Sequence, residues 1–567
     1  MNVQSQTSRL EELFGDPRDI ENPLGFAQIV AADERGELLA AGERALDEWN
    51  FNAEFVPVAL GGRLHALDDL TRRIRTVFRR DAALALGYGV TSLMAAVNIW
   101  ASGSASQQQQ AAKLLLARQR IAVGYHELEH GNDFLSNELR ARPDGTMFRL
   151  DGHKQVINNC ERAAAIVLFA RTNEAPGARS HSLLFVDTRE LARDQVRLLP
   201  RYRTSAMRGC KLGGIEFTDC AVPRDNLLGR EGSGVQTALR SFQVTRAVLP
   251  GMALGILDTG LRTVTTFAAE RRLYSTQVSE LPHARNALAR VFVDLLIADC
   301  FARSVTRGLH LFPEQASAWA ASVKYLVPLM MEQAMNDLSI ILGARFYLRE
   351  GAHAIFGKHY RDVPVISLGH AGATACLLTI LPQLFDMACR GWKAAEAPTA
   401  LFDHGEVLPP LDFSRLRIAG LDQDALGSML LAAAEDDYSR HGEEAVGPMI
   451  RNLASELRQL AEAARHLGPA DRSVEASAAA FGIAERYPLL LAASACIQTW
   501  RHHRAHAPGH WLAGTDWIRA ALTRLTHRIA GHSTALPKEL VEPLFAELRD
   551  RVEHNRSCCL DGEPLKG

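Results

Sequence analysis

Residues 214–234 read GIEFTDCAVPRDNLLGREGSG, and the character of the chain changes inside this stretch. Its first part, GIEFTD, is a short apolar run of the kind that forms a β-strand, and turn-forming prolines and glycines follow it. From Val235 onward apolar residues return at three- and four-residue spacing, which is typical of an amphipathic helix. The stretch therefore predicts the point where a β-domain gives way to a helical one.

The same two sequence patterns, strand-like runs and helical spacing, continue in both directions along the chain. Before this point, from Arg120, the runs IAVGY, AAIVLFA and SLLFVD alternate with turn sequences such as PDGT. The chain before residue 120 and the chain after residue 413 again show helical spacing, and the proline-containing stretch 393–412 reads as a linker. We expect a mainly α, α+β protein with four parts: a helical domain (1–119), a β-domain (120–230), a helical bundle (231–392) and a linker with a helical extension (393–567).

Bulk properties exclude several classes of protein. The chain has 567 residues, a net charge of −2 and a pI near 6.9, so no overall charge draws it to nucleic acid or to an anionic membrane. Its nine cysteines are scattered, which suits free thiols in a reducing compartment. The uncharged stretch 82–105 is rich in Ala, Gly and Ser, so we expect a buried helix and no membrane span. We expect a cytoplasmic protein.

One motif imitates a zinc site. The stretch 125–134 reads YHELEHGNDF, and HELEH matches the pattern in which two histidines on one helical turn hold Zn²⁺. That pattern needs a helix through both histidines, because only helical spacing brings positions i and i+4 together. Here the motif follows a predicted strand and runs into Gly131, so we expect no metal site. The basic cluster RHHRAH, residues 501–506, is expected on a solvated helix face.

Five motifs in order give the chain a resemblance to the acyl-CoA dehydrogenase/acyl-CoA oxidase superfamily, as a divergent long form. They are YHELEHGNDF, LDGHKQVINNCERAAAIVLFAR, GIEFTDCAVPRDNLLGREGSG, FAAERRLY, and GARFY followed by HYRDVPVISLGHAGAT. The similarity covers roughly residues 70–392. The resemblance implies an acyl-CoA dehydrogenase-like fold, with FAD between the β-domain, the bundle and a neighbouring subunit, and hence a homodimer or homotetramer.

The resemblance also places residues at the cofactor. They are Tyr125, His126, Asn132, Val156, Asn158, Arg271, Tyr274, Gly343 and Ala344. His126 stands where the family prefers Thr, and Val156 stands where it prefers Trp. Asn158 is in the position that contacts the flavin, where its amide can donate a hydrogen bond. Arg271 matches an arginine that reaches the FAD pyrophosphate across a subunit interface, which suits a guanidinium.

The implied reaction removes a proton from Cα and a hydride from Cβ of an acyl thioester carried by CoA or by an acyl carrier protein. Electrons would pass to an electron-transfer flavoprotein or to oxygen. Arg246 matches an arginine beside the acyl-binding helix. The family's glutamate base is missing: its position holds His370, and an alternative position on the Arg246 helix holds Thr245. A neutral imidazole is a competent base near pH 7, so His370 is the candidate base.

Three readings of this chain stay open at this point. The first is an FAD-dependent oxidoreductase that desaturates an acyl thioester, in a specialised or secondary-metabolic pathway. The second is a flavin-dependent monooxygenase on the same fold, which has no need of the missing carboxylate. The third is a non-catalytic binding protein that has lost several polar FAD contacts.

Overall fold

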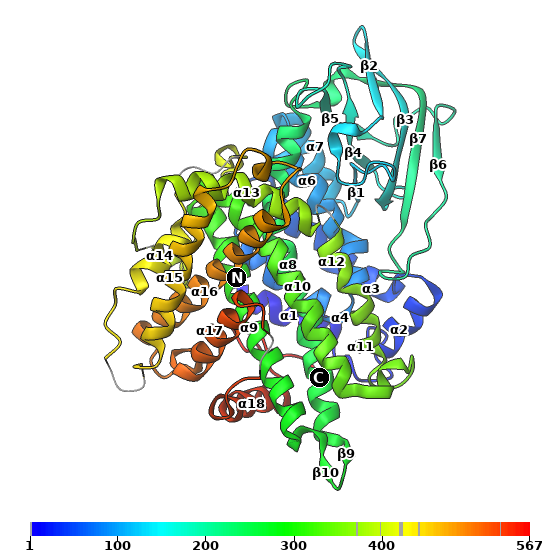
Figure 1. The fold of residues 1–567 in the computed structure, drawn as a ribbon. Coiled ribbons are helices and arrows are strands. Elements are labelled where there is room, and N and C mark those ends of the chain that lie inside the picture. Colours follow the sequence, from blue (N-terminus) through cyan, green and yellow to red (C-terminus); the bar gives the residue numbers. More distant parts are fainter. Residues whose placement is uncertain (1–2, 370–371, 397, 419–422, 440–442, 533–534) are drawn as a thin grey trace.

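The computed structural model describes residues 3–369, 372–396, 398–418, 423–439, 443–532 and 535–567. Helices precede the sheet, follow it and make up the C-terminal part of the chain, so the predicted mainly α fold with a central β-domain is confirmed. Figure 1 shows the sheet at one end of the molecule, with the long helices beside and below it. The candidate site lies where these two parts meet.

The N-terminal helices form one layer against the bundle. They are α1 (Val3–Phe14), α2 (Phe26–Arg35), α3 (Ala40–Trp49), α4 (Leu67–Arg80), α5 (Ala82–Ala85), α6 (Thr91–Ser102) and α7 (Ala105–Leu116). Between α5 and α6 the chain makes a π-helical turn, η3 (Leu86–Val90). The stretch Ala82–Ser102 is long and apolar enough to cross a membrane by length and composition, yet 89% of its most apolar window is buried inside the fold. The helix expected there is therefore a core helix in this structure.

The β-domain is one mixed sheet. Its strands are β1 (Ile121–Gly124), β2 (Arg140–Asp144), β3 (Met147–Asn158), β4 (Ala165–Arg171), β5 (His181–Asp187), β6 (Val196–Leu199), β7 (Leu212–Pro223) and β8 (Leu227–Leu228). The order is β6-β7-β3-β2-β4-β5-β8, and β1 pairs in parallel with β4. The register of β3 against β7 shifts between Lys154 and Ile157, and Val156 at this bulge has a left-handed φ of 56°. The bulge turns the end of β3 toward the helices.

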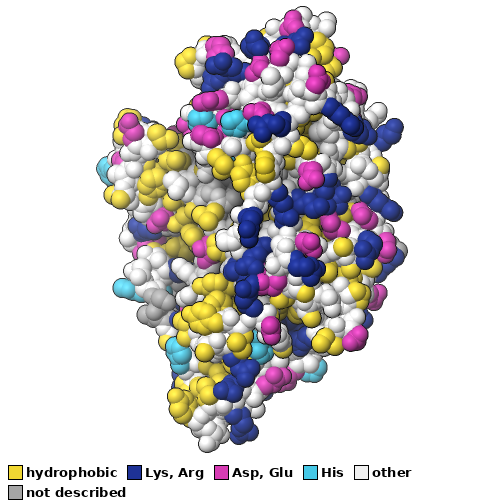
Figure 2. Space-filling model, turned by 90° about the vertical axis from the view of Figure 1, so that its right-hand side faces the viewer, with side chains coloured by type: hydrophobic (Ala, Val, Ile, Leu, Met, Phe, Trp, Pro, Cys, Tyr) yellow, Lys and Arg dark blue, Asp and Glu magenta, His cyan; other side chains and the backbone are white. Residues whose placement is uncertain are grey.

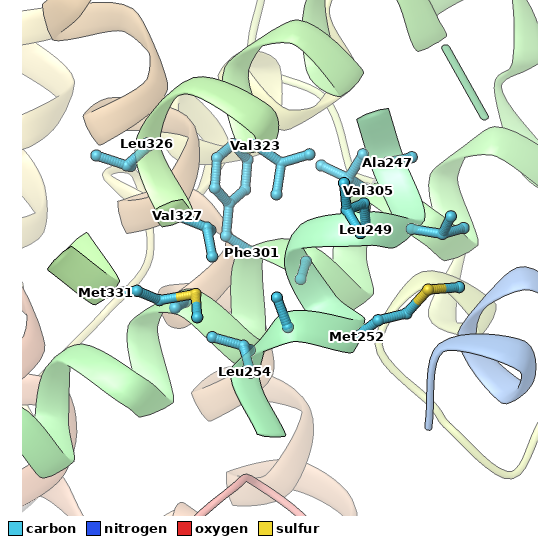
Figure 3. Close-up of a cluster of buried hydrophobic side chains, with 14 of the residues drawn as sticks. Ala247, Leu249, Met252, Leu254, Phe301, Val305, Val323, Leu326, Val327 and Met331 are labelled. Carbon is cyan, nitrogen blue, oxygen red and sulfur yellow. The ribbon is translucent and has the colours of Figure 1, made fainter. Parts of the chain in front are cut away.

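Long helices form the bundle. They are α8 (Gly234–Glu270), α9 (Pro282–Leu311), α10 (Ala316–Leu342) and α13 (Ala373–Arg390), with the short α11 (Ala354–Asp362) and α12 (Pro364–Leu368) before α13. Figure 3 shows Leu249 of α8, Phe301 of α9 and Val323 of α10 in one apolar cluster. The strand-to-helix change predicted within 214–234 is confirmed, because β7 ends at Pro223 and α8 begins at Gly234.

Two elements project from the far end of the bundle. A hairpin of β9 (Arg272–Leu273) and β10 (Thr276–Gln277) joins α8 to α9, and the turn η8 (Gly343–Tyr347) follows α10. Tyr274 and Ser275 at the hairpin tip have φ values of 50° and 66°, and the Tyr274 side chain is 90% exposed. Both elements lie away from the β-domain (Figure 1).

The C-terminal extension packs against α9 and α10. It contains α14 (Ala425–Ala433), α15 (Val446–Arg465), α16 (Ala478–His506), α17 (Thr515–Ile529) and α18 (Lys538–Glu553). The last residues then return to the core. Asp561 accepts two hydrogen bonds of 2.6 Å from Arg303, and Arg72 of α4 lies 3.1 Å from the same carboxylate. The chain end therefore supplies a counter-ion for buried arginines of α4 and α9.

Candidate functional site

The YHELEHGNDF stretch carries no helix through its two histidines. Strand β1 ends at Gly124, and residues 126–133 run through irregular backbone and turns. His130 Nε2 lies 3.4 Å from Glu138, while the His126 ring packs against Phe134 with 5.8 Å between ring centroids. Within the described residues no group of three or more metal-ligating side chains could hold an ion. The motif is a strand end and a turn.

Glu127 holds this turn in place. Its carboxylate accepts hydrogen bonds from the backbone N–H groups of Glu138 at 2.7 Å and Leu139 at 3.1 Å. Buried Lys154 of β3 donates to the same carboxylate at 2.7 Å. Burial lowers the pKa of Lys154 to about 8 although Glu127 opposes that shift. Glu127 therefore braces the turn.

Tyr125 points into the protein. Its side chain is 2% exposed, and its hydroxyl donates to Asn98 Oδ1 of α6 at 2.6 Å. Its ring meets those of Phe134, Phe169 and Phe242 with centroid distances between 5.7 and 6.0 Å. Strand β1, α6 and α8 are thus joined by one aromatic cluster, and Tyr125 is at its centre.

His126, the next residue, is half-buried, and its ring contacts the same Phe134 ring as Tyr125 does. Burial lowers the pKa of His126, since the charged imidazolium loses solvation there. A neutral imidazole is therefore favoured at this position near pH 7. Such a ring has one donor and one acceptor for a neighbouring ligand.

Val156 and Asn158 end strand β3 beside the π-helical turn. Asn158 Nδ2 donates to the Leu86 carbonyl oxygen and to Thr91 Oγ1, each at 3.1 Å. Because a carbonyl oxygen only accepts, the amide nitrogen faces the turn and Oδ1 faces away from it. Among the described residues Asn158 Oδ1 is buried and has no hydrogen-bond partner. Asn158 was predicted to donate a hydrogen bond to the flavin through its amide nitrogen. In the structure that nitrogen is already used, and the unpaired atom is the acceptor Oδ1.

Residues 366–369 and Gly372 lie beside the YHELEHGNDF turn, and we call the region between them and the turn the candidate site. A Cβ atom built on Gly372 would lie 3.8 Å from Asn132 Nδ2, so the segments meet. Lys324 of α10 is 1% exposed and holds the segment by donating to the carbonyl oxygens of Ile366 and, at 3.1 Å, Gly369. His370, the predicted base, lies outside the described residues.

Arg246 of α8 is the other cation beside the candidate site. It is 4% exposed, and its Nη1 donates to Thr379 Oγ1 of α13 at 3.3 Å. Its guanidinium lies 5.6 Å from the centroid of the Phe242 ring. Burial lowers the pKa of Arg246, as it does that of Lys324, which falls to about 8. Both groups are within electrostatic range of Cys376.

The remaining predicted cofactor residues form a separate set. Arg271 and Tyr274 are at the exposed hairpin, and Gly343 and Ala344 are exposed in η8. Figure 1 places these two elements at the opposite end of the bundle from β1. The structure therefore brings Tyr125, His126, Asn132, Val156, Asn158 and Arg246 to one region and leaves the other four predicted residues at a surface that one chain does not close over.

Sequence reasoning missed several residues of the region. Asn98, Phe134 and Phe242 hold Tyr125, but in the sequence they are ordinary members of apolar helices and turns. Lys324 did carry a signal: it is the single charge in the apolar run ASAWAASVKYLVPLMM, residues 316–331. A lone lysine on a core helix indicates a fixed partner.

Residues of this region suit an isoalloxazine ring. An N–H group of the ring could donate to the partnerless Asn158 Oδ1, which would remove the cost of a buried unpaired acceptor. Half-buried Val156 and His126 offer apolar and aromatic surface beside it. At the separate set, a side chain added at Gly343 would meet no atom within 4 Å, so a ligand could approach that backbone closely.

Two family models match the chain, and the candidate site takes residues from both matched stretches. Residues 122–220 match the acyl-CoA dehydrogenase middle domain, and residues 232–383 match the acyl-CoA dehydrogenase C-terminal domain. Residues 122–220 and 232–383 thus belong to the acyl-CoA dehydrogenase middle and C-terminal domain families, which confirms the resemblance that the five motifs predicted.

Individual relatives are distant. Mitochondrial isovaleryl-CoA dehydrogenase of Arabidopsis thaliana is 22% identical over 59% of this chain and 78% of its own length. Glutaryl-CoA dehydrogenase of Desulfococcus multivorans is 24% identical over 65% of this chain and 92% of its own. The crystal structure of an acyl-CoA dehydrogenase complexed with FAD from Bacillus anthracis has a TM-score of 0.68 at 15% identity and covers 96% of this chain and 90% of that one. The prolyl acyl carrier protein oxidase AnaB has a TM-score of 0.60 at 15% identity, with 67% and 98% covered. The match to the Bacillus protein includes the C-terminal extension in the shared fold.

Proposed function

We propose that this protein is an FAD-dependent oxidoreductase that desaturates an acyl thioester between Cα and Cβ. The observation that carries the proposal is the meeting of the Asn132 turn with the Gly372 segment, between two acyl-CoA dehydrogenase domain matches. Relatives named as acyl-CoA dehydrogenases and a neighbour named as an acyl carrier protein oxidase support the thioester substrate.

Bound FAD would supply the acceptor for the hydride. The residues of this chain would bind and orient the cofactor and the thioester, and would remove the α-proton. Asn158 would accept a hydrogen bond from the ring through Oδ1, and His126 and Val156 would line it. Arg271 with Gly343 would take the diphosphate of a neighbouring chain's cofactor, which implies a dimer or tetramer. His370 would remove the α-proton, a role that the sequence alone supports.

The carrier of the acyl group remains CoA or an acyl carrier protein in this proposal. Both present the thioester on a phosphorylated arm, and an acidic carrier would also be attracted by cations. Figure 2 shows one face of the molecule, on which Lys and Arg side chains gather below the β-domain. Such surfaces raise the association rate of anionic partners.

A visible absorption spectrum of the purified full-length protein, repeated after anaerobic addition of acyl thioesters, tests the proposal. We expect one FAD per chain and bleaching of the flavin band by at least one thioester. Protein that binds no FAD under reconstitution would contradict the cofactor. Protein with bound FAD that no acyl-CoA and no acyl carrier protein thioester bleaches would contradict the reaction.

A further inference from the structure

A cavity of about 850 Å³ lies where the helical bundle meets the C-terminal extension. Helix α10 and the chain around Val363 form one wall, and α16 with the end of α17 forms the other (Figure 1). Small-molecule sites typically have volumes of roughly 300–1,000 Å³. Of the described residues that line the cavity, none is among those predicted for the cofactor or the substrate. The cavity is therefore separate from the candidate site.

Four charged side chains of the lining already have partners of opposite charge outside it. Arg524 and Arg528 share Asp294, Arg486 pairs with Glu456, and Asp337 pairs with Arg290, at distances of 2.6 to 3.1 Å. These four side chains therefore need no ligand to balance their charge.

Two further carboxylates of the lining differ from these. Glu332 of α10 and Glu485 of α16 have no cationic side chain within 4.0 Å in the part of the chain that the structure describes. Their neighbours are hydroxyl groups. Ser367 donates to Glu332, while burial and the adjacent Glu485 raise the pKa of Tyr325. A hydroxyl group solvates a carboxylate without neutralising it, so the lining and its partners carry an excess of negative charge.

Tyr325 shows that the two carboxylates face the same space. It lies beside Glu485 and is seven residues before Glu332 on α10. Seven residues make about two helical turns, or roughly 10 Å along the axis, so Tyr325 and Glu332 share a face of α10. Leu329 lies on this face between them, and Val363 contributes apolar surface from the neighbouring helix. The cavity thus combines acidic groups with an apolar wall.

We infer that this cavity binds an organic amine with an apolar body. The ammonium group would lie against Glu332 and Glu485, which the chain leaves without a cation. Apolar parts of the ligand would pack on Leu329. The rings of Tyr325 and Tyr360 line the same space, and the face of an aromatic ring attracts a cation. This site and its ligand are independent of the reaction proposed for the candidate site.

Three indole compounds of similar size test the charge of the ligand. Tryptamine is a cation, tryptophol is neutral and indolepropionate is an anion, and calorimetry with the purified full-length protein gives their dissociation constants. We expect tryptamine to bind at least about fivefold more tightly than tryptophol, since an ion pair in a partly exposed site changes affinity by about that factor. Indolepropionate should bind most weakly. Equal affinities, tightest binding of indolepropionate, or binding of none of the three would overturn the inference.

Variants of the two acids locate the amine. Glu332→Gln and Glu485→Gln keep the size of each side chain and remove one charge, so each should weaken tryptamine binding at least about threefold and leave tryptophol binding unchanged. Glu475→Gln is the control, because Glu475 is exposed and does not line the cavity. Tryptamine binding that neither acid variant weakens would overturn the inference.

A filled cavity provides a test that changes no charge. Gly482 lines the cavity, and a Cβ atom added there would meet no atom within 4 Å. Gly482→Leu should therefore place its side chain in open space, and it should not weaken α16, because Leu favours a helix more than Gly does. We expect this variant to lose binding of tryptamine and tryptophol alike. Undiminished binding would show that the ligand lies elsewhere.

Discussion

Asn158 Nδ2 and the Leu86 carbonyl oxygen are 3.1 Å apart, and this hydrogen bond joins the end of strand β3 to the π-helical turn between α5 and α6. The bond fixes the direction of the Asn158 amide, so its Oδ1 is left as a buried acceptor. A structural contact and a candidate cofactor contact therefore belong to one side chain.

The first prediction concerns this side chain. Asn158→Leu removes the donor and leaves the Leu86 carbonyl buried without its partner, so we expect the free energy of unfolding to fall by about 1–3 kcal/mol. The same change removes Oδ1 and should lower FAD content after dialysis. Thr91→Val is the matched control, because it removes the second acceptor and keeps the Leu86 bond and Oδ1. Urea denaturation and the ratio of flavin to protein absorbance measure both effects; equal FAD content in the two variants would contradict the cofactor role of Oδ1.

The second prediction separates the two histidines of HELEH. His126→Ala should shift the visible spectrum of the bound flavin and weaken FAD retention, because His126 is half-buried beside the proposed ring position. His130→Ala should change stability by less than about 1 kcal/mol, because half-buried His130 makes long contacts, 3.7 Å to Glu127 and 3.4 Å to Glu138. Chelator treatment should leave both spectrum and stability unchanged. A spectrum altered by His130→Ala and unaltered by His126→Ala would reverse this assignment.

Some features of the candidate site could be predicted from the sequence alone and others could not. The irregular backbone of 126–133 was predictable, because turn-forming residues follow a strand-like run, and the strand-to-helix change before α8 was predictable from a change in apolar spacing. The π-helical turn at Leu86–Val90 was not, since the stretch around it reads as one uninterrupted apolar helix. The contacts of the Tyr125 side chain could not be predicted from the sequence either. Its partner Asn98 is 27 residues away and carries no pattern of its own.

Long-range charge pairing was the least predictable feature. DGEPLKG, the last seven residues, has the composition of a solvated tail, yet the Asp561 carboxylate, with its side chain 22% exposed, pairs with Arg303 and Arg72. The reason is that α4 carries several arginines on faces that the fold buries, and these need carboxylates from wherever the chain can supply them. Partners hundreds of residues apart leave no local signal in one sequence.

The third prediction follows from that pairing. Asp561→Asn keeps the size of the side chain but removes the charge that Arg303 and Arg72 share. Because Arg303 keeps Asp299 and Arg72 keeps Glu563, we expect a loss of about 1–3 kcal/mol in the free energy of unfolding. Glu553→Gln, on exposed surface near the end of α18, is the control and should cost less than about 1 kcal/mol. Urea denaturation followed by circular dichroism measures both. Equal, small losses would mean that the chain end contributes little to the core.

The fourth prediction concerns acid stability and His181. This buried residue stacks on Phe169 with 4.7 Å between ring centroids, and its ring nitrogens bond Ser180 Oγ at 2.8 Å and the Asn137 carbonyl oxygen at 3.1 Å. Burial lowers the pKa of His181 to about 4 from an ordinary value of 6.5. Between these two pH values the unfolded chain binds a proton that the folded chain does not bind. Stability is therefore lost as the pH falls from 6.5 toward 4.

We expect His181 to account for roughly 1–3 kcal/mol of that loss, because each unit of difference between the folded and unfolded pKa corresponds to about 1.4 kcal/mol. His181→Gln retains a donor for the Asn137 carbonyl and cannot titrate, so its free energy of unfolding should fall less steeply between pH 6.5 and 4 than that of the unmodified protein. Urea denaturation at half-unit pH intervals gives the two slopes. If the two curves of unfolding free energy against pH are parallel, His181 does not contribute to the acid sensitivity and other buried groups cause it.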